Sequence, residues 1–274
     1  MPVLETPTKT IWDDTSPAFS SAAISSHLAL VHNWFPTLAN RINGPLWSVA
    51  TEWQIYFFFP LLLLPVWRRF GPLATVLTGF AVGSAFTWLA PAAAHSAAAW
   101  YLGLFALGMC AAGIGFTERP AELALRARVR WGLLSLLLLG LVAFGSTALI
   151  HIWFRVMPYS DALVGAATAS SLVYLTGHAL APATEARPLV LRCLEATPLV
   201  ELGRFSYSLY LTHLPVVALC YFGLHGLKLS ESTELFALVG LSLPLSVLFS
   251  YAFYRVFERR FIGSPAAFFG KHAA

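Results

Sequence analysis

Long apolar segments separated by short polar ones recur along almost the whole chain. A helix of about 20 apolar residues crosses a bilayer core of about 30 Å, because each residue adds about 1.5 Å. The boundaries between the apolar segments hold Gly, Pro and Ser, which favour turns. The pattern predicts seven spans, at residues 46–67, 71–90, 98–117, 131–151, 158–181, 204–225 and 234–257. We therefore expect an all-α fold, a polytopic membrane helix bundle.

Residues 1–45 precede the first predicted span and are mixed in character, with no basic stretch followed by an apolar one such as begins a signal peptide. A short helical pattern near Ser25–Phe35 is suited to the membrane interface, although it is too short to cross a bilayer. The sequence thus predicts three parts: a segment at 1–45 that carries this interfacial helix, a transmembrane domain at 46–261 and a tail at 262–274.

Composition and charge support the membrane interpretation and orient the chain. Hydrophobic residues make up 58% of the sequence and charged residues 11%, far from the balance of a soluble domain. The three cysteines show neither disulfide-type nor metal-ligand spacing. Of the 17 Lys and Arg residues, thirteen lie on one side of the predicted bundle, and the other side has only Lys9, Arg41, Arg155 and Lys228. The positive-inside rule then predicts an inner-membrane protein with segment 1–45 outside and a cytoplasmic C-terminus, and it explains the basic residues without a nucleic-acid partner.

The first predicted span carries a carboxylate, Glu52, about 9 Å along the helix from Leu46. An ionisable group at that depth costs at least about 2.5–3.5 kcal/mol, so it normally faces a protein interior or a wet cavity and is often functional. Ser48, Glu52 and Tyr56 share one helix face, which we expect to look inward. The opposite face, expected to meet lipid, consists of Trp53, Phe57 and Leu61. The alternative is that Glu52 only pins helices together by hydrogen bonding.

The sixth predicted span carries the best candidate for a general base. Tyr207, Tyr210 and His213 recur at intervals of three and form a partly polar stripe along a helix that begins after Gly203. A histidine supplies a base most naturally at neutral pH. The alternative is that His213 satisfies a backbone carbonyl or a tyrosine hydroxyl within the bundle.

Arginines at the ends of the predicted spans could either bind a phosphate group or anchor the helix ends at the membrane surface. Arg204 begins the sixth span, and a guanidinium can bind a phosphate group through two hydrogen bonds. Positive-inside anchoring explains the same residue. The cluster of Arg126, Arg128 and Arg130 has these two interpretations as well, and for it we favour anchoring or lipid head groups.

Three segments in order resemble the acyltransferase 3 family of integral-membrane O-acyltransferases. PLWSVATEWQIYFFFPLLL resembles that family's Trp-Ser-x-x-x-Glu segment with its aromatic run and Pro. LGRFSYSLYLTHLPVV resembles its Gly-x-x-Ser-Tyr-x-x-Tyr-x-x-His-x-Pro helix, and FERRF its closing Glu-Arg-Pro-Phe, with Arg260 in place of Pro. The resemblance covers about Ser25 to the C-terminus.

The resemblance implies a ten-span fold of which this chain holds the last seven spans. The family's proposed catalytic His and its Arg partner lie in the first span and have no counterpart here, so we expect the chain alone to be impaired. The implied activity moves an acyl group from acyl-CoA to a hydroxyl of a carbohydrate or glycolipid acceptor, with no bound cofactor or metal. The candidate catalytic residues are Glu52 and His213, and the candidate substrate-binding residues are Trp47, Ser48, Tyr56, Arg204, Tyr207 and Tyr210. The alternative is a non-catalytic membrane protein, a transporter-like or scaffold remnant of the same fold.

Overall fold

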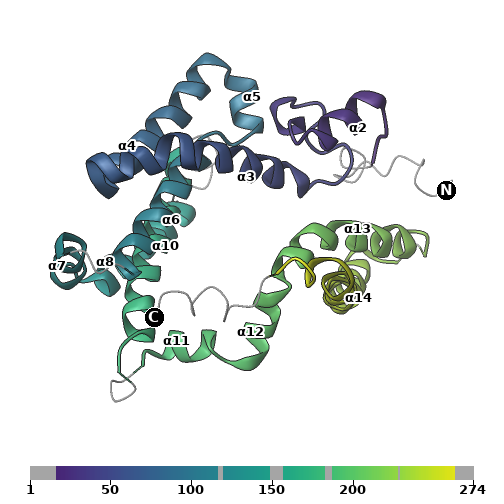
Figure 1. Ribbon diagram of the computed structural model, residues 1–274. Coiled ribbons are helices and arrows are strands. Elements are labelled where there is room, and N and C mark those ends of the chain that lie inside the picture. Colours follow the sequence, from purple (N-terminus) through teal and green to yellow (C-terminus); the bar gives the residue numbers. More distant parts are fainter. Residues whose placement is uncertain (1–16, 117–119, 149–156, 183–186, 228, 263–274) are drawn as a thin grey trace. The chain divides into compact units, whose positions relative to one another are not determined.

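Helices account for nearly all of the regular structure. The computed structural model describes residues 17–116, 120–148, 157–182, 187–227 and 229–262, and these ranges contain no strand (Figure 1). The elements are α2 (Ser21–Leu28), the 3₁₀ turn η2 (His32–Trp34), α3 (Leu46–Phe58), the π-helical turn η3 (Phe59–Leu63), α4 (Leu64–Leu89), α5 (Pro91–Ser96), α6 (Tyr101–Phe116), α7 (Pro120–Arg128), α8 (Trp131–Ala148), α10 (Met157–Ala179), α11 (Leu189–Leu194), α12 (Thr197–Arg204), α13 (Ser206–His225), α14 (Glu231–Phe253) and the π-helical turn η5 (Tyr254–Glu258).

The predicted spans all coincide with helices, namely α3, α4, α6, α8, α10, α13 and α14. Three helical stretches of the described chain are long and apolar enough to cross a membrane: Leu46–Leu89, Ser206–His225 and Glu231–Glu258. A bent pair, Glu122–Arg128 with Trp131–Gly145, raises the number to four. Helix α6 is apolar but shorter. The all-α membrane bundle is therefore confirmed as a fold class, although length and hydropathy single out fewer spans than seven.

The chain divides into two compact units. Unit 1 consists of residues 1–27, 37–47 and 196–274, and unit 2 of residues 28–36 and 48–195. This division concerns packing and does not test the predicted transmembrane domain at 46–261, which stays a prediction. Most of the predicted tail at 262–274 and the first part of segment 1–45 lie outside the described residues.

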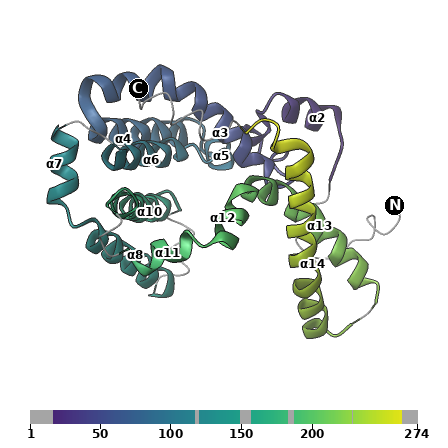
Figure 2. The same ribbon diagram turned by 60° about the horizontal axis from the view of Figure 1, so that its bottom comes forward.

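In unit 2, helices stack through glycines in the order α4, α6, α10 and α8 (Figure 2). A Cβ atom at Gly83 of α4 would lie 2.7 Å from the carbonyl oxygen of Ala99, and one at Gly79 would lie 2.9 Å from that of Leu102. Small residues four positions apart let membrane helices approach this closely. On α6, Gly103 lies under the ring of Phe80. The glycines thus set the distance between α4 and the chain entering α6.

Two irregularities shape the long helical stretch from Leu46 to Leu89. The π-helical turn η3 begins at Phe59 and Pro60, where the missing proline N–H breaks the regular ladder. Gly71 has φ of +84°, a backbone conformation that favours glycine, and Pro72 follows it inside α4. The boundary predicted at Gly71 and Pro72 is therefore a kink between two helical segments.

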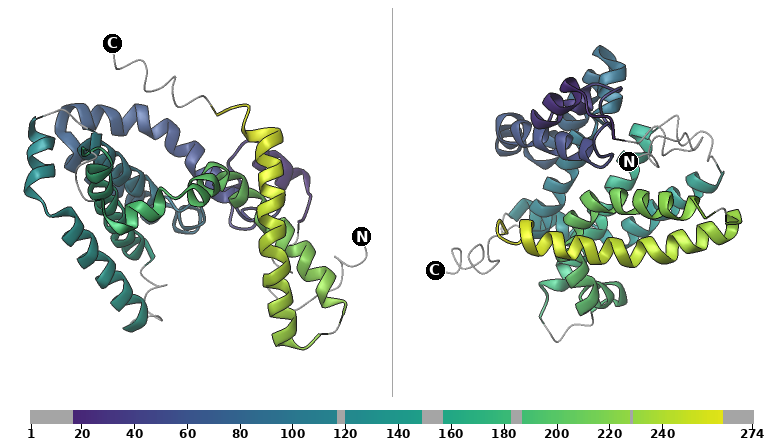
Figure 3. Two further views of the ribbon diagram at one scale, coloured as in Figure 1. Left: turned by 90° about the horizontal axis from the view of Figure 1, so that it is seen from below. Right: turned by 90° about the vertical axis from the view of Figure 1, so that its right-hand side faces the viewer.

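In unit 1, α13 and α14 pack along each other, as the two views of Figure 3 show. The loop between them ends at Ser230, whose hydroxyl accepts a 3.4 Å hydrogen bond from the backbone N–H of Thr233. Glu231 and Glu234 stand in the first turn of α14, where a carboxylate interacts favourably with the helix dipole. Serine caps such as this one fix where the second helix of a pair begins.

The helical pattern predicted near Ser25–Phe35 is present as two short pieces, α2 and η2. Leu30 separates them with φ of +54°. Both His32 and Asn33 in η2 are fully buried. The turn η2 is therefore packed into unit 2.

Candidate functional site

The carboxylate of Glu52 and the hydroxyl of Tyr56 form a hydrogen-bonded pair on α3. Tyr56 donates the bond, one helical turn after Glu52. Both side chains are exposed on the surface of unit 2. The prediction that they share a face is confirmed. Unit 2 by itself leaves this face uncovered, and the prediction that it looks toward the interior of the bundle stays a prediction. The apolar side chains Trp53, Phe57 and Leu61 are exposed as expected.

The inward face of α3 is formed by Ala50, Thr51 and Ile55. Thr51 donates a 2.9 Å hydrogen bond to the carbonyl oxygen of Ala97. Because a buried hydroxyl must keep its partner, this bond rotates α3 so that Glu52 points away from the core of the unit. The pattern of hydrophobic residues does not predict this rotation, because Thr51 and Glu52 are adjacent polar residues and either could face the core.

A buried polar network lies beside Glu52, and the sequence analysis missed it. Gln54 donates to the side-chain oxygen of Asn33 at 2.8 Å and to the carbonyl oxygen of Leu30 at 3.0 Å. Its own oxygen accepts a 2.8 Å bond from the indole of Trp34. Asn33 also donates to Thr51 at 3.0 Å. Two features of the sequence could have predicted this network: the run His32, Asn33 and Trp34, and Gln54 inside an apolar span. Polar side chains in a membrane need hydrogen-bond partners.

The remaining predicted residues of this segment divide between the two units. Ser48 is half-buried in unit 2, whereas Trp47 is half-buried and belongs to unit 1. Each of the two makes an interaction of its own. The substrate-binding roles of Trp47, Ser48 and Tyr56 stay predictions.

In unit 1, His213 is held by the backbone of its own helix. Its Nδ1 lies 2.8 Å from the carbonyl oxygen of Tyr210 and 3.2 Å from that of Leu209. A carbonyl only accepts, so Nδ1 carries the proton and donates it. No described residue bonds Nε2, which in the neutral ring is the unprotonated nitrogen. The alternative of a bond to backbone carbonyl is therefore observed, and it is compatible with Nε2 acting as a base.

The predicted tyrosine stripe is present next to this histidine. Tyr207 and Tyr210 are both exposed on α13. The ring centroids of Tyr210 and His213 lie 6.1 Å apart with an interplanar angle of 42°. Two phenols and one imidazole thus follow one side of the helix, as their spacing of three predicts.

A seam of small hydroxyl side chains joins α13 to α14. Ser208 donates to the carboxylate of Glu258 in η5. One turn further on, the hydroxyls of Thr212 and Ser250 lie 2.7 Å apart. The seam connects the tyrosine and histidine segment of the sequence to the FERRF segment, although the two are separate motifs in the sequence. The sequence did not predict a role for Ser208 or Glu258.

Asn43 and Gly44 contact α13 close to His213. The side-chain N–H of Asn43 donates a 2.8 Å hydrogen bond to the carbonyl oxygen of Leu211. A Cβ atom on Gly44 would lie 2.9 Å from a methyl carbon of Leu214. The turn that precedes α3 therefore packs against the histidine-bearing segment of α13.

Arg204 stands at the end of α12 and forms an exposed ion pair with Glu201 at 2.5 Å. Exposed pairs of this kind contribute little to stability, so the guanidinium is available to other anions. Neither its phosphate-binding role nor its anchoring role is decided by this contact. Across the described ranges, no group of three His, Cys, Asp or Glu side chains could hold a metal ion.

The fold and these side chains define a membrane protein with polar groups built into apolar helices. A family model described as an acyltransferase domain, that of acyltransferase 3, matches residues 3–255. The chain therefore belongs to the acyltransferase 3 family and is a membrane acyltransferase. No curated protein and no solved structure matches the chain.

Proposed function

We propose that this protein transfers an acyl group from acyl-CoA to a hydroxyl group of a carbohydrate or glycolipid acceptor. The observation that carries the proposal is the family match, which spans residues 3–255 and includes Glu52 and His213. Transfer to a hydroxyl requires a base for the hydroxyl proton and stabilisation of the oxyanion that forms at the thioester carbonyl.

His213 is our candidate for the base. Its Nδ1–H is engaged by the carbonyl oxygens of Leu209 and Tyr210, which leaves Nε2 to accept a proton. The acceptor oxygen then bonds to the thioester carbon while its proton moves to Nε2. When the carbon–sulfur bond breaks, the imidazolium returns that proton to the coenzyme thiolate. The products are the acyl ester and free coenzyme A.

Glu52 is our second candidate for a catalytic residue. Tyr56 donates to one of its oxygens, and such a bond fixes the orientation of the carboxylate. A carboxylate accepts several hydrogen bonds at once, and sugar hydroxyls are donors. A charged and exposed group on an apolar helix has no evident role in packing unit 2, which favours a functional one.

Acyl transfer by the purified chain in lipid tests the proposal. Labelled acyl-CoA is supplied with envelope glycan and glycolipid fractions, and the label is followed into the acceptor. Glu52→Gln and His213→Ala should each lower transfer by about 10²–10⁴-fold. The matched controls are Glu231→Gln and His225→Ala, on exposed side chains near the ends of α14 and α13. Transfer is measured for this chain alone, which we expect to be impaired, and for the chain supplied with the family's first three spans; absence of transfer in both cases would favour the non-catalytic interpretation.

Arg204 is proposed to bind a phosphate of the coenzyme. Loss of such a contact weakens binding of the donor without altering the chemical step. Arg204→Gln should therefore raise the KM for acyl-CoA with kcat nearly unchanged. Arg192→Gln, on an exposed arginine of α11, is the control. Equal kinetic constants for the two variants would assign Arg204 to membrane anchoring.

The orientation proposed for the chain puts the loop at Ser230 outside and the end of α7 in the cytoplasm, in the inner membrane. The excess of Lys and Arg on one side of the predicted bundle supports this orientation. In a background without native cysteines, Ser232→Cys should react with an impermeant thiol reagent in intact cells. Arg128→Cys should react only after permeabilisation. Reaction of Arg128→Cys from outside would reverse the orientation.

A further inference from the structure

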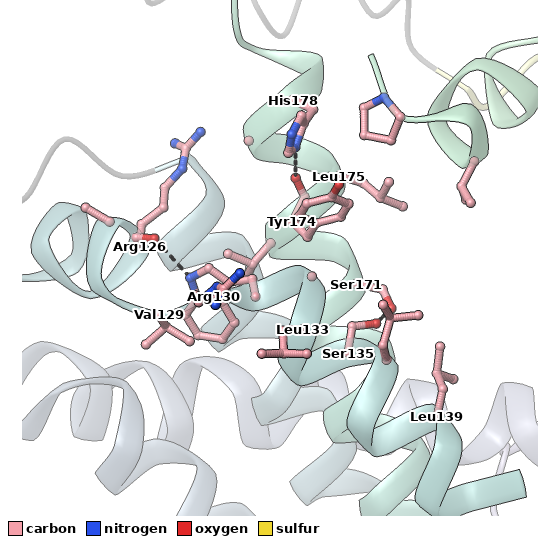
Figure 4. Close-up of a pocket in the computed structure, with 18 of the residues that line it drawn as sticks. Arg126, Val129, Arg130, Leu133, Ser135, Leu139, Ser171, Tyr174, Leu175 and His178 are labelled. Carbon is pink, nitrogen blue, oxygen red and sulfur yellow. Dashed lines mark hydrogen bonds between the residues drawn. The ribbon is translucent and has the colours of Figure 1, made fainter. Parts of the chain in front are cut away.

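Unit 2 contains a groove of about 1140 Å³ that none of the residues assigned to acyl transfer line. Its walls come from α7 and α8 on one side and from α10 and the start of α11 on the other (Figure 4). Most of the lining is apolar, and its basic side chains are Arg126, Arg130 and His178. The lining residues that the structure describes include no carboxylate.

The bend between α7 and α8 fixes the depth of this groove in a membrane. The two helices meet at 68°, and Val129 and Arg130 lie at the bend. Transmembrane helices tilt by about 20° on average from the bilayer normal. If α8 crosses the membrane, α7 then lies closer to the membrane plane than to the normal. Arg130 therefore falls where the chain enters the bilayer, at the level of lipid head groups.

The basic side chains at one end of the groove have hydrogen-bond donors that the described chain does not use. Arg126 donates a 3.0 Å hydrogen bond to the carbonyl oxygen of Gly115, which ties α7 to the last turn of α6. The side chain of Arg130 is exposed, and no hydrogen bond or ion pair joins its guanidinium to the described residues, whereas its backbone carbonyl accepts from the N–H of Leu134. The Nδ1–H of His178 donates to the carbonyl oxygen of Tyr174 at 2.9 Å, so a second proton would go to Nε2. An anion at this end would therefore meet the guanidinium of Arg130, with which no described carboxylate pairs.

The rest of the groove is apolar over a length that matches one leaflet. Leu139 follows Arg130 by nine residues, which is about 13 Å along a helix. Half of a bilayer core of about 30 Å is about 15 Å. One polar pair interrupts the wall: the hydroxyls of Ser135 and Ser171 lie 2.6 Å apart and so satisfy each other. Apolar side chains make up the remainder, among them Leu133, Leu136, Val173, Leu175, Leu189 and Val190.

We propose that this groove binds an anionic phospholipid. The phosphate would lie at Arg130, near Arg126 and His178, and one acyl chain would follow the leucines of α8. Charge complementarity favours an anionic occupant, because a zwitterionic head group brings a compensating cation to the same place. A guanidinium at head-group depth matches a phosphate through paired hydrogen bonds. This inference does not depend on the proposed acyl transfer.

Lipid retention measured by native mass spectrometry tests the basic end. The protein is released from nanodiscs that contain equal amounts of phosphatidylglycerol and phosphatidylcholine with identical acyl chains. The unchanged chain should retain phosphatidylglycerol in preference. Arg130→Gln should lower this preference by about fivefold, the value of one basic residue at a membrane surface. Arg128→Gln removes the same charge from an exposed residue outside the groove and should leave the preference intact.

A second pair of variants tests the apolar part. Leu136→Trp would fill the groove, whereas Leu137→Trp places the same bulk on a neighbouring exposed leucine that does not line it. Only Leu136→Trp should reduce retention of phosphatidylglycerol. Equal losses for Arg128→Gln and Arg130→Gln would reduce the effect to general surface charge and overturn the proposal. Displacement of the retained lipid by acyl-CoA would also overturn it and assign the groove to the acyl donor.

Discussion

The side chain of Asn43 takes the place of a helical hydrogen bond that Pro215 removes. In a regular helix the carbonyl oxygen of Leu211 would accept from the N–H four residues later, and Pro215 has none. Instead, Asn43 donates to that oxygen at 2.8 Å across 168 positions of sequence. A free carbonyl in a membrane helix is normally satisfied by a neighbouring segment. The turn before α3 is thereby fixed to the segment that carries His213.

A double-mutant cycle measures this relationship. Asn43→Ala should lower the free energy of unfolding by about 1–2 kcal/mol, the range for a polar contact between membrane helices. In a Pro215→Ala background, residue 215 regains its N–H and bonds Leu211 itself, so Asn43→Ala should have a much smaller effect. Thermal unfolding in detergent gives the four stabilities. Equal effects of Asn43→Ala in both backgrounds would show that the two residues are independent.

Ser208 and Glu258 should stabilise the pairing of α13 with α14. Ser208 is fully buried and donates to the carboxylate of Glu258, so Ser208→Ala leaves that carboxylate without its partner. We expect a loss of roughly 0.6–1.7 kcal/mol, measured by thermal unfolding in detergent. Ser206→Ala is the control, because Ser206 is exposed and bonds only the carbonyl of Gly203 in the preceding turn. A similar loss in both variants would contradict a special role for Ser208.

Gly83 should tolerate no side chain. A Cβ there would lie 2.7 Å from the carbonyl oxygen of Ala99 and 2.8 Å from the Cα of Trp100, both of them backbone atoms. Because backbone cannot rotate away, Gly83→Ala should separate α4 from the chain entering α6 and destabilise unit 2 by about 1–3 kcal/mol. Gly108→Ala meets nothing within 4 Å and should be neutral or stabilising. Comparison of the two thermal midpoints is the measurement.

Thr51 should contribute to the stability of unit 2, because its side chain joins α3 to η2 and to the chain that follows α5. Its hydroxyl accepts from Asn33 and donates to the carbonyl oxygen of Ala97. Thr51→Val keeps the shape, breaks both bonds and should lower stability by about 1–2 kcal/mol. Thr168→Val is matched, since exposed Thr168 bonds only Val164 of its own helix. If Thr51→Val lowered the free energy of unfolding no more than Thr168→Val does, the hydrogen bonds of Thr51 would not contribute to stability.

Much of the fold could be predicted from the sequence because a bilayer leaves few choices. Backbone groups in hydrocarbon must be satisfied within a segment, so an apolar run of sufficient length becomes a helix. Helices accordingly stand at every predicted span, and the family that the three segments resemble is the one whose model matches. That Glu52 and Tyr56 share a helix face also followed from spacing, because they are four residues apart, whereas their hydrogen bond was seen only in the structure.

Which face of each helix is buried could not be predicted in this way. On α3, a polar face and an apolar face were both visible in the sequence, and the buried one lies between them at Thr51 and Ile55. The choice depends on Ala97 and Asn33, which are distant along the chain. Hydropathy identifies residues that tolerate lipid but does not say which neighbour will satisfy a hydroxyl.

By itself, then, the sequence determined the helices, the membrane as their surroundings and the family, because these depend on composition and on spacing within one segment, and it supplied the candidates for acyl-transfer chemistry. Only the tertiary structure decided the partners: Asn43 for Leu211, Ser208 for Glu258 and the wall of α10 for Arg126 and Arg130. The physical reason is that a hydrogen bond or a groove between segments depends on the rotation and the distance of two helices. Those are set by the packing of many side chains together, as at Gly83, and not by any one motif.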